Sequence, residues 1–317
     1  MASDTAGDPM GPLKWTRKST RKASRELKRR KISASPRTVA RLLKMQLSFS
    51  LKANRKTIAE TQHPDRDQQF NYIAKMNEHF ATLGEPAISV DGKKKELVGN
   101  FYNPGRAWRR HADKVSDHDF RSTATAIATP YGIYDVQANH GFVVVGTSHD
   151  TAEFAVDNSA CWLKSLGPTL YPQLKELLIL CDTGGSNGYR CRVWKYALQQ
   201  RLCDVFGIAV TVCHYPTGAS KWNPIEHRLF SHISGNWAGI PLRSLETMLK
   251  YIRTTETQNG LKVRARLSKK KYFTRVKIDD EQMTEINISR HHILPEWNYT
   301  IYPTATMWNS KSACSPK

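Results

Sequence analysis

Residues 177–188 read LLILCDTGGSNG, and this stretch decides the fold. The unbroken apolar run at 177–181 is typical of a buried strand in the centre of an α/β sheet. Asp182 follows at the carboxyl end of that strand, where open α/β sheets bind their ligands. Gly184 and Gly185 let the backbone turn sharply, so the carboxylate stays uncovered. We therefore predict that Asp182 is a functional carboxylate.

A second strand and a helix are predicted downstream. Residues 209–213 (AVTVC) predict another buried strand, and residues 221–230 (KWNPIEHRLF) predict a turn that runs into a helix. Pro224 suits the first helical turn, with Asn223 as the N-cap. The apolar side chains of this helix share one face, and Glu226 lies at the edge of that face. From there a carboxylate can point over the sheet edge toward the strand-end aspartate.

Three more strands are predicted upstream, and the first of them also ends on a carboxylate. The strand at 87–90 (AISV) is followed directly by Asp91. The other predicted elements are a hairpin of strands 131–136 and 141–146 and a helix at 151–166 that is closed by Gly167-Pro168. Three strands with a hairpin, then alternating helices and strands, are the order of an RNase H-like fold. The predicted fold class is therefore α/β, an RNase H-like mixed sheet flanked by helices and preceded by an all-α helix-turn-helix module.

In an RNase H-like fold, three acidic residues gather from the first strand, a later strand and a late helix. Asp91, Asp182 and Glu226 occupy these positions. Three carboxylates suit phosphoryl transfer, because two Mg²⁺ ions about 3.5–4 Å apart activate the nucleophile and stabilise the leaving oxygen, and they take hard oxygen ligands. A Cys/His cluster would select a softer metal. We predict all three residues as catalytic and metal-binding, with Mg²⁺ as the cofactor and Mn²⁺ as a substitute.

Other side chains compete for these roles. Asp117 and Asp119 lie in a predicted loop and Asp135 lies inside a hairpin strand, so the strand-end position favours Asp91. The histidines that could act as ligands or acid/base groups are His118, His214 and His227. A histidine near a helix start is more often a hydrogen-bonded structural residue, and a direct role for His227 stays open.

The charge of the chain is large and uneven. The formal net charge is +20 and the pI is near 9.8, which indicates a polyanionic partner. Residues 1–60 hold 16 Lys or Arg and 4 Asp or Glu, so they carry +12 of this charge. Helices are predicted there at 19–30 and 37–45, the second after a Ser-Pro start. This favours a helix-turn-helix on DNA, with a basic helical hairpin that merely packs on the domain as the alternative.

The predicted DNA-binding residues are basic and fall into two groups. Those of the N-terminal module are Arg37, Arg41, Lys44, Lys52, Arg55 and Lys56. Those near the predicted carboxylates are Lys93, Lys94, Lys95, Lys221 and Arg228. The run of three lysines directly after the first strand would suit an anionic backbone that lies across the site.

Four segments are predicted from these patterns. They are the basic helix-turn-helix module at 1–60, a linker helix at 61–85, the RNase H-like catalytic domain at 86–241 and a basic C-terminal extension at 242–317. Residues 261–267 (LKVRARL) alternate apolar and basic side chains. That alternation predicts either a strand that lies along DNA or a solvated edge strand protected by its charges.

The cysteine pattern and the hydropathy of the chain indicate the cell compartment in which the protein is expected. The six cysteines form no CxxC pair and no Cys/His spacing of the zinc-site kind, and several lie in apolar runs, which favours reduced thiols. The N-terminus lacks a signal-peptide pattern, and no run approaches the roughly 18 apolar residues of a membrane span. We expect a cytoplasmic, nucleoid-associated protein of prokaryotic type with no membrane partner.

Seven motifs along the chain resemble those of the Rhodopirellula-type transposase family, insertion-sequence transposases of the DDE superfamily. They are 12–16 PLKWT, 51–56 LKANRK, 62–67 QHPDRD, 93–101 KKKELVGNF, 184–188 GGSNG, 220–230 SKWNPIEHRLF and 296–301 EWNYTI. The resemblance runs from about residue 7 to residue 301. It implies Asp91, Asp182 and Glu226 as the catalytic triad. It also implies double-stranded DNA with terminal inverted repeats and target DNA as partners, bound by a homo-oligomer.

Two departures from the family pattern matter. Members usually have Thr after the first acidic residue and Gly after the second, whereas this chain has Gly92 and Thr183. Neither position supplies a carboxylate, so metal binding should survive. The family also usually extends further at its N-terminus, so the module at 1–60 is expected to be N-terminally truncated.

Three functions compete on this sequence. The first is a transposase that catalyses two-metal cleavage and strand transfer at insertion-sequence ends. The second is a catalytically inactive DNA-binding remnant of such an enzyme, because a fold alone does not carry a function. The third is an RNase H-like nuclease without strand transfer. The three acidic residues favour the first over the second, and the basic N-terminal module argues against the third.

Overall fold

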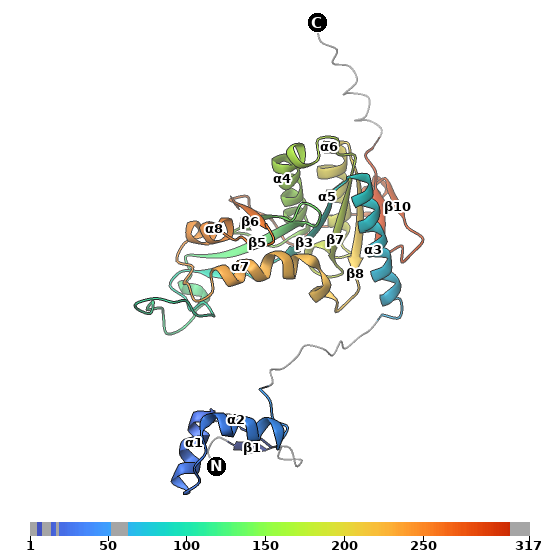
Figure 1. The fold of residues 1–317 in the computed structure, drawn as a ribbon. Coiled ribbons are helices and arrows are strands. Elements are labelled where there is room, and N and C mark those ends of the chain that lie inside the picture. Colours follow the sequence, from blue (N-terminus) through green and yellow to red (C-terminus); the bar gives the residue numbers. More distant parts are fainter. Residues whose placement is uncertain (1–4, 8–13, 17–18, 52–62, 305–317) are drawn as a thin grey trace. The chain divides into compact units, whose positions relative to one another are not determined.

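The computed structural model describes residues 5–7, 14–16, 19–51 and 63–304 (Figure 1). These residues fall into two compact units, Met1–Ile58 and Ala59–Lys317, called here the N-terminal unit and the sheet unit. Three of the predicted DNA-binding residues, Lys52, Arg55 and Lys56, lie outside the described residues.

The N-terminal unit contains the two predicted helices, α1 (Thr20–Arg29) and α2 (Pro36–Met45), and a short strand pair, β1 (Thr5–Gly7) and β2 (Lys14–Thr16). Ser35 caps α2, because its side chain accepts a hydrogen bond from the Thr38 backbone N–H at 3.1 Å, and proline follows at the first helical position. Val39 is the one buried side chain of the two described helices. The helix pair is confirmed, and its use as a helix-turn-helix on DNA stays a prediction.

The sheet unit is built on nine strands in the order β10-β11-β8-β7-β3-β5-β6-β9, with β4 paired to β5 beside this path. The strands are β3 (Ala87–Gly92), β4 (Glu96–Val98), β5 (Ala126–Asp135), β6 (His140–Gly146), β7 (Glu176–Asp182), β8 (Ala209–Tyr215), β9 (Lys262–Ser268), β10 (Ile288–Arg290) and β11 (Asn298–Ile301). The apolar runs that predict strands therefore all lie in one sheet.

The central five strands have RNase H-like topology. β3, β5 and β6 are antiparallel neighbours, and β7 and β8 then continue the sheet parallel to β3 on its other side. The parallel crossovers pass through helices, as parallel pairs require. This arrangement confirms the predicted fold class of an RNase H-like mixed sheet flanked by helices.

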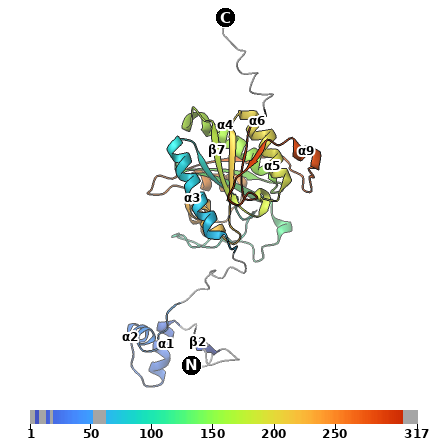
Figure 2. The same ribbon diagram turned by 90° about the vertical axis from the view of Figure 1, so that its right-hand side faces the viewer.

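Helices cover both faces of the sheet (Figure 1). One face packs on α4 (Ala152–Leu170) and α5 (Arg192–Leu198), and the apolar core there includes the buried Trp162 and Trp194. The other face packs on α3 (Arg66–Leu83) over β7 and β8, and on α7 (Ser231–Asn236) and α8 (Leu245–Arg253) over β5 and β6. Figure 2 shows α3 and α5 on opposite sides of β7. The shorter helices are α6 (Asp204–Phe206) and α9 (Asp280–Thr284).

Two helices differ from the predicted pattern. Helix α4 continues through Pro168 to Leu170 instead of closing at Gly167. Pro168 lies in the last turn, where only one intrahelical donor is lost, and the Tyr171 N–H still reaches the Gly167 carbonyl at 2.7 Å. The helix after β7 is interrupted by a π-helical segment, η4 (Gln199–Cys203), that the 3.6-residue periodicity does not reveal.

The C-terminal part is integrated in the sheet and is not an extension beside it. β9 pairs in parallel with β6 at one edge, and β11 pairs with β8 at the other. The linker helix predicted at 61–85 corresponds to α3, which also packs on the sheet. Residues 262–268 form a strand at the edge of the sheet, with Val263 and Ala265 facing inward and basic side chains between them, and a position of this strand along DNA stays a prediction. No described helix is both long and apolar enough to cross a membrane.

Candidate active site

Asp91 and Asp182 lie level with each other at the ends of two neighbouring strands. β3 and β7 run parallel, and the register pairs Ser89 with Leu180, so the two aspartates follow two residues later on each strand. Side chains two residues apart share a face of a sheet. Both carboxylates therefore lie on the face that packs on α3 and on the helix that carries Glu226. This convergence was expected from the RNase H-like order of the predicted elements.

Glu226 lies on a helical segment that begins directly over β3. Helical backbone starts at Pro224 and becomes π-helical at η6 (Glu226–Phe230) before continuing as α7. Gly132 of β5 makes room for this segment, because a Cβ there would come within 2.4 Å of the Phe230 ring. Single π turns are frequent at functional sites. The segment brings the half-buried Glu226 to the aspartates, and its charge contributes to the raised pKa values of both.

A buried hydrogen-bond network holds the helix start against the two strands. The Ser89 hydroxyl donates to the Asn223 side-chain oxygen, and the Asn223 amide nitrogen donates to Asp182 Oδ1 at 3.1 Å. The backbone N–H of Ile225 donates to Ser89 Oγ at 3.1 Å. Ser89 and Asn223 are fully buried. The network fixes the orientation of one carboxylate and the position of the helix that carries another.

Asn223 was predicted as the N-cap of this helix, and the structure gives its side chain a different task. The residue does precede the helix in extended backbone, but its amide bonds Ser89 and Asp182. The helical donor at Ile225 is instead satisfied by the hydroxyl of Ser89 from β3. The local pattern could identify the helix start, whereas the partners come from strands more than 40 residues away. A serine inside the apolar run 87–90 was the available signal for Ser89.

The electrostatics of the site favour a bound cation. Burial and the nearby negative charge of Asp182 together raise the pKa of Asp91 to about 7, against the hydrogen bond from the Gly92 N–H. Burial and the charge of Glu226 also raise the pKa of Asp182, while the bond from Asn223 lowers it. Within the described part of the chain, none of the three carboxylates forms an ion pair with Lys, Arg or His. Their mutual repulsion therefore lacks an internal counter-charge.

The donor set fits a hard divalent cation. Carboxylate oxygens are the ligands that Mg²⁺ and Mn²⁺ take, and Asp91, Asp182 and Glu226 supply them without a competing thiolate or imidazole. Among the residues that the structure describes, no three His, Cys, Asp or Glu side chains already converge into a group that could hold a metal ion. The assignment of these three as ligands therefore stays a proposal.

Asp150 is a fourth carboxylate near the site, and the sequence patterns did not identify it as a candidate. A Cβ at Gly92 would lie 2.8 Å from Asp150 Oδ2, so a larger residue directly after Asp91 would displace this side chain. Burial raises the pKa of Asp150, and Ser186 and Lys95 lower it. The glycine that departs from the family pattern thus makes room for an acidic neighbour.

The competing acidic residues have structural or exposed positions. Asp135 is fully buried, and its carboxylate accepts hydrogen bonds from the Tyr171 hydroxyl and from two backbone N–H groups of the β5–β6 turn. Asp117 and Asp119 lie in exposed coil, as the sequence predicted. Neither Asp117 nor Asp119 lies at the end of a strand.

The three histidines also lie in different settings. His214 is fully buried, with both ring nitrogens 2.9 Å from the carbonyls of Trp297 and Asn187, and burial lowers its pKa to about 4. His227 is exposed, and its Nε2 contacts the Lys221 carbonyl. His118 is exposed beside Asp117. These contacts are those of structural or surface residues.

The predicted DNA-binding residues in the described ranges are mostly exposed. Those with exposed side chains are Arg37, Arg41, Lys44, Lys94, Lys95, Lys221 and Arg228. Lys93 differs, because its side chain is only 9% exposed. Its ammonium lies 2.7 Å from Glu96 Oε1 and 4.8 Å from the centroid of the Trp237 ring. Sequence could not separate Lys93 from its two neighbours, since the three lysines form one run.

Comparison with solved structures finds complexes of Mos1 transposase. The mariner Mos1 paired end complex with Mg aligns with a TM-score of 0.46 and 11% identity, and the pre-cleavage Mos1 transpososome with 0.45 and 12%. The Mos1 strand transfer complex gives 0.42 and 14%. Each alignment covers 74% of this chain and 64–66% of the Mos1 chain. TM-scores and sequence identities this low do not establish the chemistry of this chain.

Comparison with sequences is more specific. No protein with curated function matches the chain. The model of the Rhodopirellula transposase DDE domain matches residues 1–303, which is nearly the whole chain and includes both units. The chain therefore belongs to the Rhodopirellula transposase DDE domain family.

Proposed function

We propose that the chain is a DDE transposase that cleaves DNA strands at the ends of an insertion sequence and joins them to target DNA. One observation carries the proposal. Asp91 and Asp182 lie level at the ends of two parallel strands, and a buried network ties the helix of Glu226 to the same two strands. The membership of the family agrees with this reading.

The three carboxylates would hold divalent metal, with Mg²⁺ as the cofactor and Mn²⁺ as a substitute. When bound, the metal lowers the pKa of the attacking hydroxyl and stabilises charge at phosphorus and on the leaving oxygen. The residues of this chain orient the ligands. Asn223 directs Asp182 by its amide N–H, and Ser89 holds the helix start so that Glu226 faces the aspartates.

The partners in this proposal are double-stranded DNA with terminal inverted repeats and target DNA, bound by a homo-oligomer. The N-terminal unit exposes Arg37, Arg41 and Lys44 along one helix, which favours sequence-independent phosphate contacts and a helix-turn-helix docking. In the sheet unit, Lys94 and Lys95 follow the first catalytic strand and are exposed. They would neutralise phosphates next to the carboxylates.

The experiment is single-turnover cleavage of a labelled duplex that carries the element's own end. Asp182→Asn should lower the rate about a thousandfold or more while the Kd for DNA changes only a few-fold, because one charge is lost at the metal site and none from the basic surfaces. The matched control is Asp119→Asn, which removes an exposed loop carboxylate and should cleave at the wild-type rate. Near wild-type cleavage by Asp182→Asn in Mg²⁺ would refute the assignment.

The products separate the competing functions. A transposase yields a strand joined to target DNA, a nuclease yields cleaved ends without joining, and an inactive remnant yields neither although it binds. The same reaction with unlabelled target plasmid measures all three outcomes on one gel. Joined product that requires Asp182 supports strand transfer, and cleavage without joined product supports the nuclease.

A further inference from the structure

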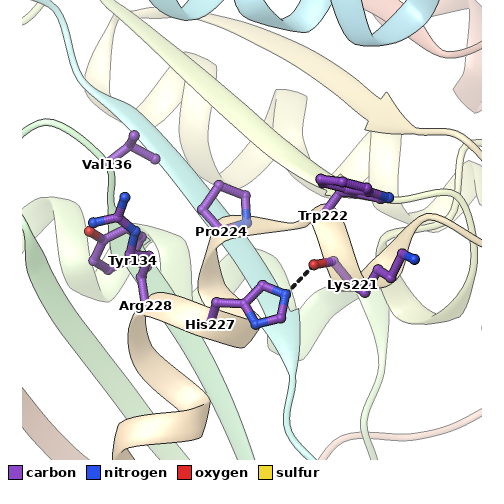
Figure 3. A pocket seen from close by; sticks show the side chains of 7 residues that line it. All are labelled: Tyr134, Val136, Lys221, Trp222, Pro224, His227 and Arg228. Carbon is purple, nitrogen blue, oxygen red and sulfur yellow. Dashed lines mark hydrogen bonds between the residues drawn. The ribbon is translucent and has the colours of Figure 1, made fainter. Parts of the chain in front are cut away.

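A pocket of about 520 Å³ lies on the sheet unit beside the start of the Glu226 helix (Figure 3). Its walls come from two segments. Tyr134 and Val136 line it from the end of β5, and the segment that begins at Lys221 contributes Trp222, His227 and Arg228. Nothing derived so far gives this pocket a role, although two of its residues were predicted to contact DNA.

The lining of the pocket is cationic and holds no carboxylate. Lys221 and Arg228 supply the positive charge of the lining. Two other pockets of the same unit each contain acidic side chains, Glu96 and Asp119 in one and Asp113 in the other. Cations without internal counter-ions favour an anionic ligand, and arginine suits phosphate because of its planar fork of donors.

Trp222 supplies an exposed aromatic side chain to the lining of the pocket. The Trp222 side chain is 55% exposed. Phe70 of α3 braces it edge to face, with ring centroids 6.0 Å apart, and Lys221 Nζ lies 5.4 Å from the centroid of its ring. Figure 3 shows Trp222 and Arg228 at opposite sides of the pocket, with Pro224 between them. A braced, exposed indole beside a cation is the arrangement on which nucleic-acid bases stack.

The pocket and the catalytic carboxylate lie on different sides of one helical segment. Pro224, His227 and Arg228 line the pocket and Glu226 does not, although all four belong to one helical segment, so Glu226 lies on another side of that segment. A helix with its side chains is about 10–12 Å across. An occupant of the pocket therefore lies within a few nucleotides of a phosphate at the carboxylates.

We propose that this pocket binds a nucleotide of the substrate strand that has left the base stack. Its base lies against Trp222 and its phosphate is held by Arg228 and Lys221. The proposal rests on the proposed function, because the occupant belongs to the strand that is cleaved next to Glu226. Holding one nucleotide out of the duplex would fix the register of the strand at the carboxylates.

The test measures binding of a fluorescein-labelled single strand of twelve thymidylates by anisotropy in EDTA, where no cleavage occurs. Trp222→Ala should raise Kd about tenfold, since loss of one stacked base costs roughly five- to 150-fold in affinity. Trp222→Phe should keep most of the affinity, because the stacking face remains. Arg228→Gln should lower the slope of log K against log[salt] by about 0.7, the value for one phosphate contact on a single strand.

Matched controls separate stacking in the pocket from a general loss of surface. Trp108 is fully exposed in another loop of the same unit and lies outside the pocket, so Trp108→Ala removes the same type of side chain from a site away from the pocket. It should leave Kd unchanged. A fully paired duplex should bind Trp222→Ala and wild type within about twofold, because no base is free to stack. The melting temperature of each variant shows that it is folded.

Two outcomes would overturn the proposal. An unchanged Kd for Trp222→Ala, or equal losses for Trp222→Ala and Trp108→Ala, would make the pocket an electropositive hollow that no base enters. Failure of the proposed function has a different signature. Asp182→Asn should bind the single strand as wild type does. If Asp182→Asn still cleaves DNA while Trp222→Ala weakens single-strand binding, the pocket proposal stands and the carboxylate assignment is rejected.

Discussion

The N-terminal helix pair and the strand-end site differ in how they hold their charged side chains. In the helix pair, Arg37, Arg41 and Lys44 are exposed, and Val39 is the one buried side chain of the two described helices. In the sheet unit, Asp91 and Asp182 lie on a core in which the flanking strand residues are fully buried. Each arrangement suits its proposed task. Phosphate binding needs mobile exposed cations, whereas metal-dependent chemistry needs carboxylates held within a fraction of an ångström.

The comparison indicates that the many exposed charges of the N-terminal segment suit DNA binding, whereas the fixed positions of the carboxylates in the sheet unit suit the chemical step. The N-terminal segment 1–60 supplies +12 of the net charge but no buried polar network among its described residues. In the sheet unit, the buried side chains of Ser89 and Asn223 orient the carboxylate of Asp182. We therefore expect changes in the first region to alter affinity and changes in the second to alter rate.

After Asp182→Asn, the largest effect should come from shortening or neutralising Glu226. Glu226→Asp retracts the carboxylate by one methylene and Glu226→Gln removes its charge, so each should lower single-turnover cleavage by about a hundredfold or more. Mn²⁺ tolerates looser geometry and should partly restore Glu226→Asp, but it should not restore Asp182→Ala.

His227→Ala is the matched control for this pair. His227 neighbours Glu226 but is exposed and contacts a carbonyl, so its loss should reduce stability more than rate. Full Mg²⁺ activity in both Glu226 variants would mean that Glu226 is a surface residue and that the third ligand lies elsewhere, with Asp150 as the next carboxylate to test.

The next largest effect should come from the helix pair. Replacing Arg37, Arg41 and Lys44 together by Gln should flatten the dependence of log K on log[salt], by about 0.9 for each phosphate contact that is lost on duplex DNA. The cleavage rate at saturating protein should stay unchanged. The control is Lys93→Gln, since Lys93 is paired with Glu96 inside the sheet unit and should leave the salt slope unaltered. An unchanged slope in the triple variant would move the DNA contacts to the sheet unit.

A smaller effect should separate the buried network from an exposed serine hydrogen bond. Asn223→Ala leaves the Ser89 hydroxyl and Asp182 without their partner in a buried place, so the free energy of unfolding of the sheet unit should fall by about 1–3 kcal/mol. Ser231→Ala removes an exposed serine of the same helix and should change it by less than about 0.5 kcal/mol. Urea unfolding measures both. Equal values would mean that the network contributes no more than a surface bond.

The smallest effect should be a pH dependence confined to the sheet unit. In the metal-free protein the pKa of Asp91 is raised to about 7, so the folded state holds this proton more tightly than the unfolded chain does. That contribution to stability is fully present below about pH 4 and is lost as pH rises through 7. In EDTA, the melting temperature of wild type should fall by a few degrees relative to Asp91→Asn between pH 5 and 8.

Two further observations check that prediction. Mg²⁺ should raise the melting temperature of wild type above pH 7 and have little effect on Asp91→Asn, because the ion replaces the proton between the carboxylates. Parallel curves for wild type and Asp91→Asn in EDTA would show that Asp91 does not titrate in this range.

Much of the fold and of the candidate site could be predicted from local patterns. The apolar runs at 177–181 and 209–213 became β7 and β8, and the Ser-Pro start at 35–36 became the start of α2. The positions of Asp91 and Asp182 at strand ends follow from the length of the apolar runs before them. These features depend on neighbouring residues alone, which is why periodicity and capping rules detect them.

The partners of these elements could not be predicted in the same way. The strand at 262–268 joins β6 more than 110 residues upstream, and β11 closes the other edge on β8. Asn223 looks like a helix cap in its local sequence, and its bonds to Ser89 and Asp182 depend on strands from elsewhere in the chain. A side chain's hydrogen-bond partner is decided by whichever group the fold brings beside it.

By itself, the sequence determined which residues are strand-end carboxylates, which segments are basic and which family the motifs resemble, because composition and short spacings carry that information. Only the tertiary structure decided that Lys93 forms an ion pair with Glu96 while the two neighbouring lysines are exposed. It also decided that Ser89, which belongs to β3, accepts a hydrogen bond from the start of the Glu226 helix, and that a cationic pocket lies on another side of that helix. The physical reason is that burial, register and pairing are properties of contacts between distant segments, which only the packed chain contains.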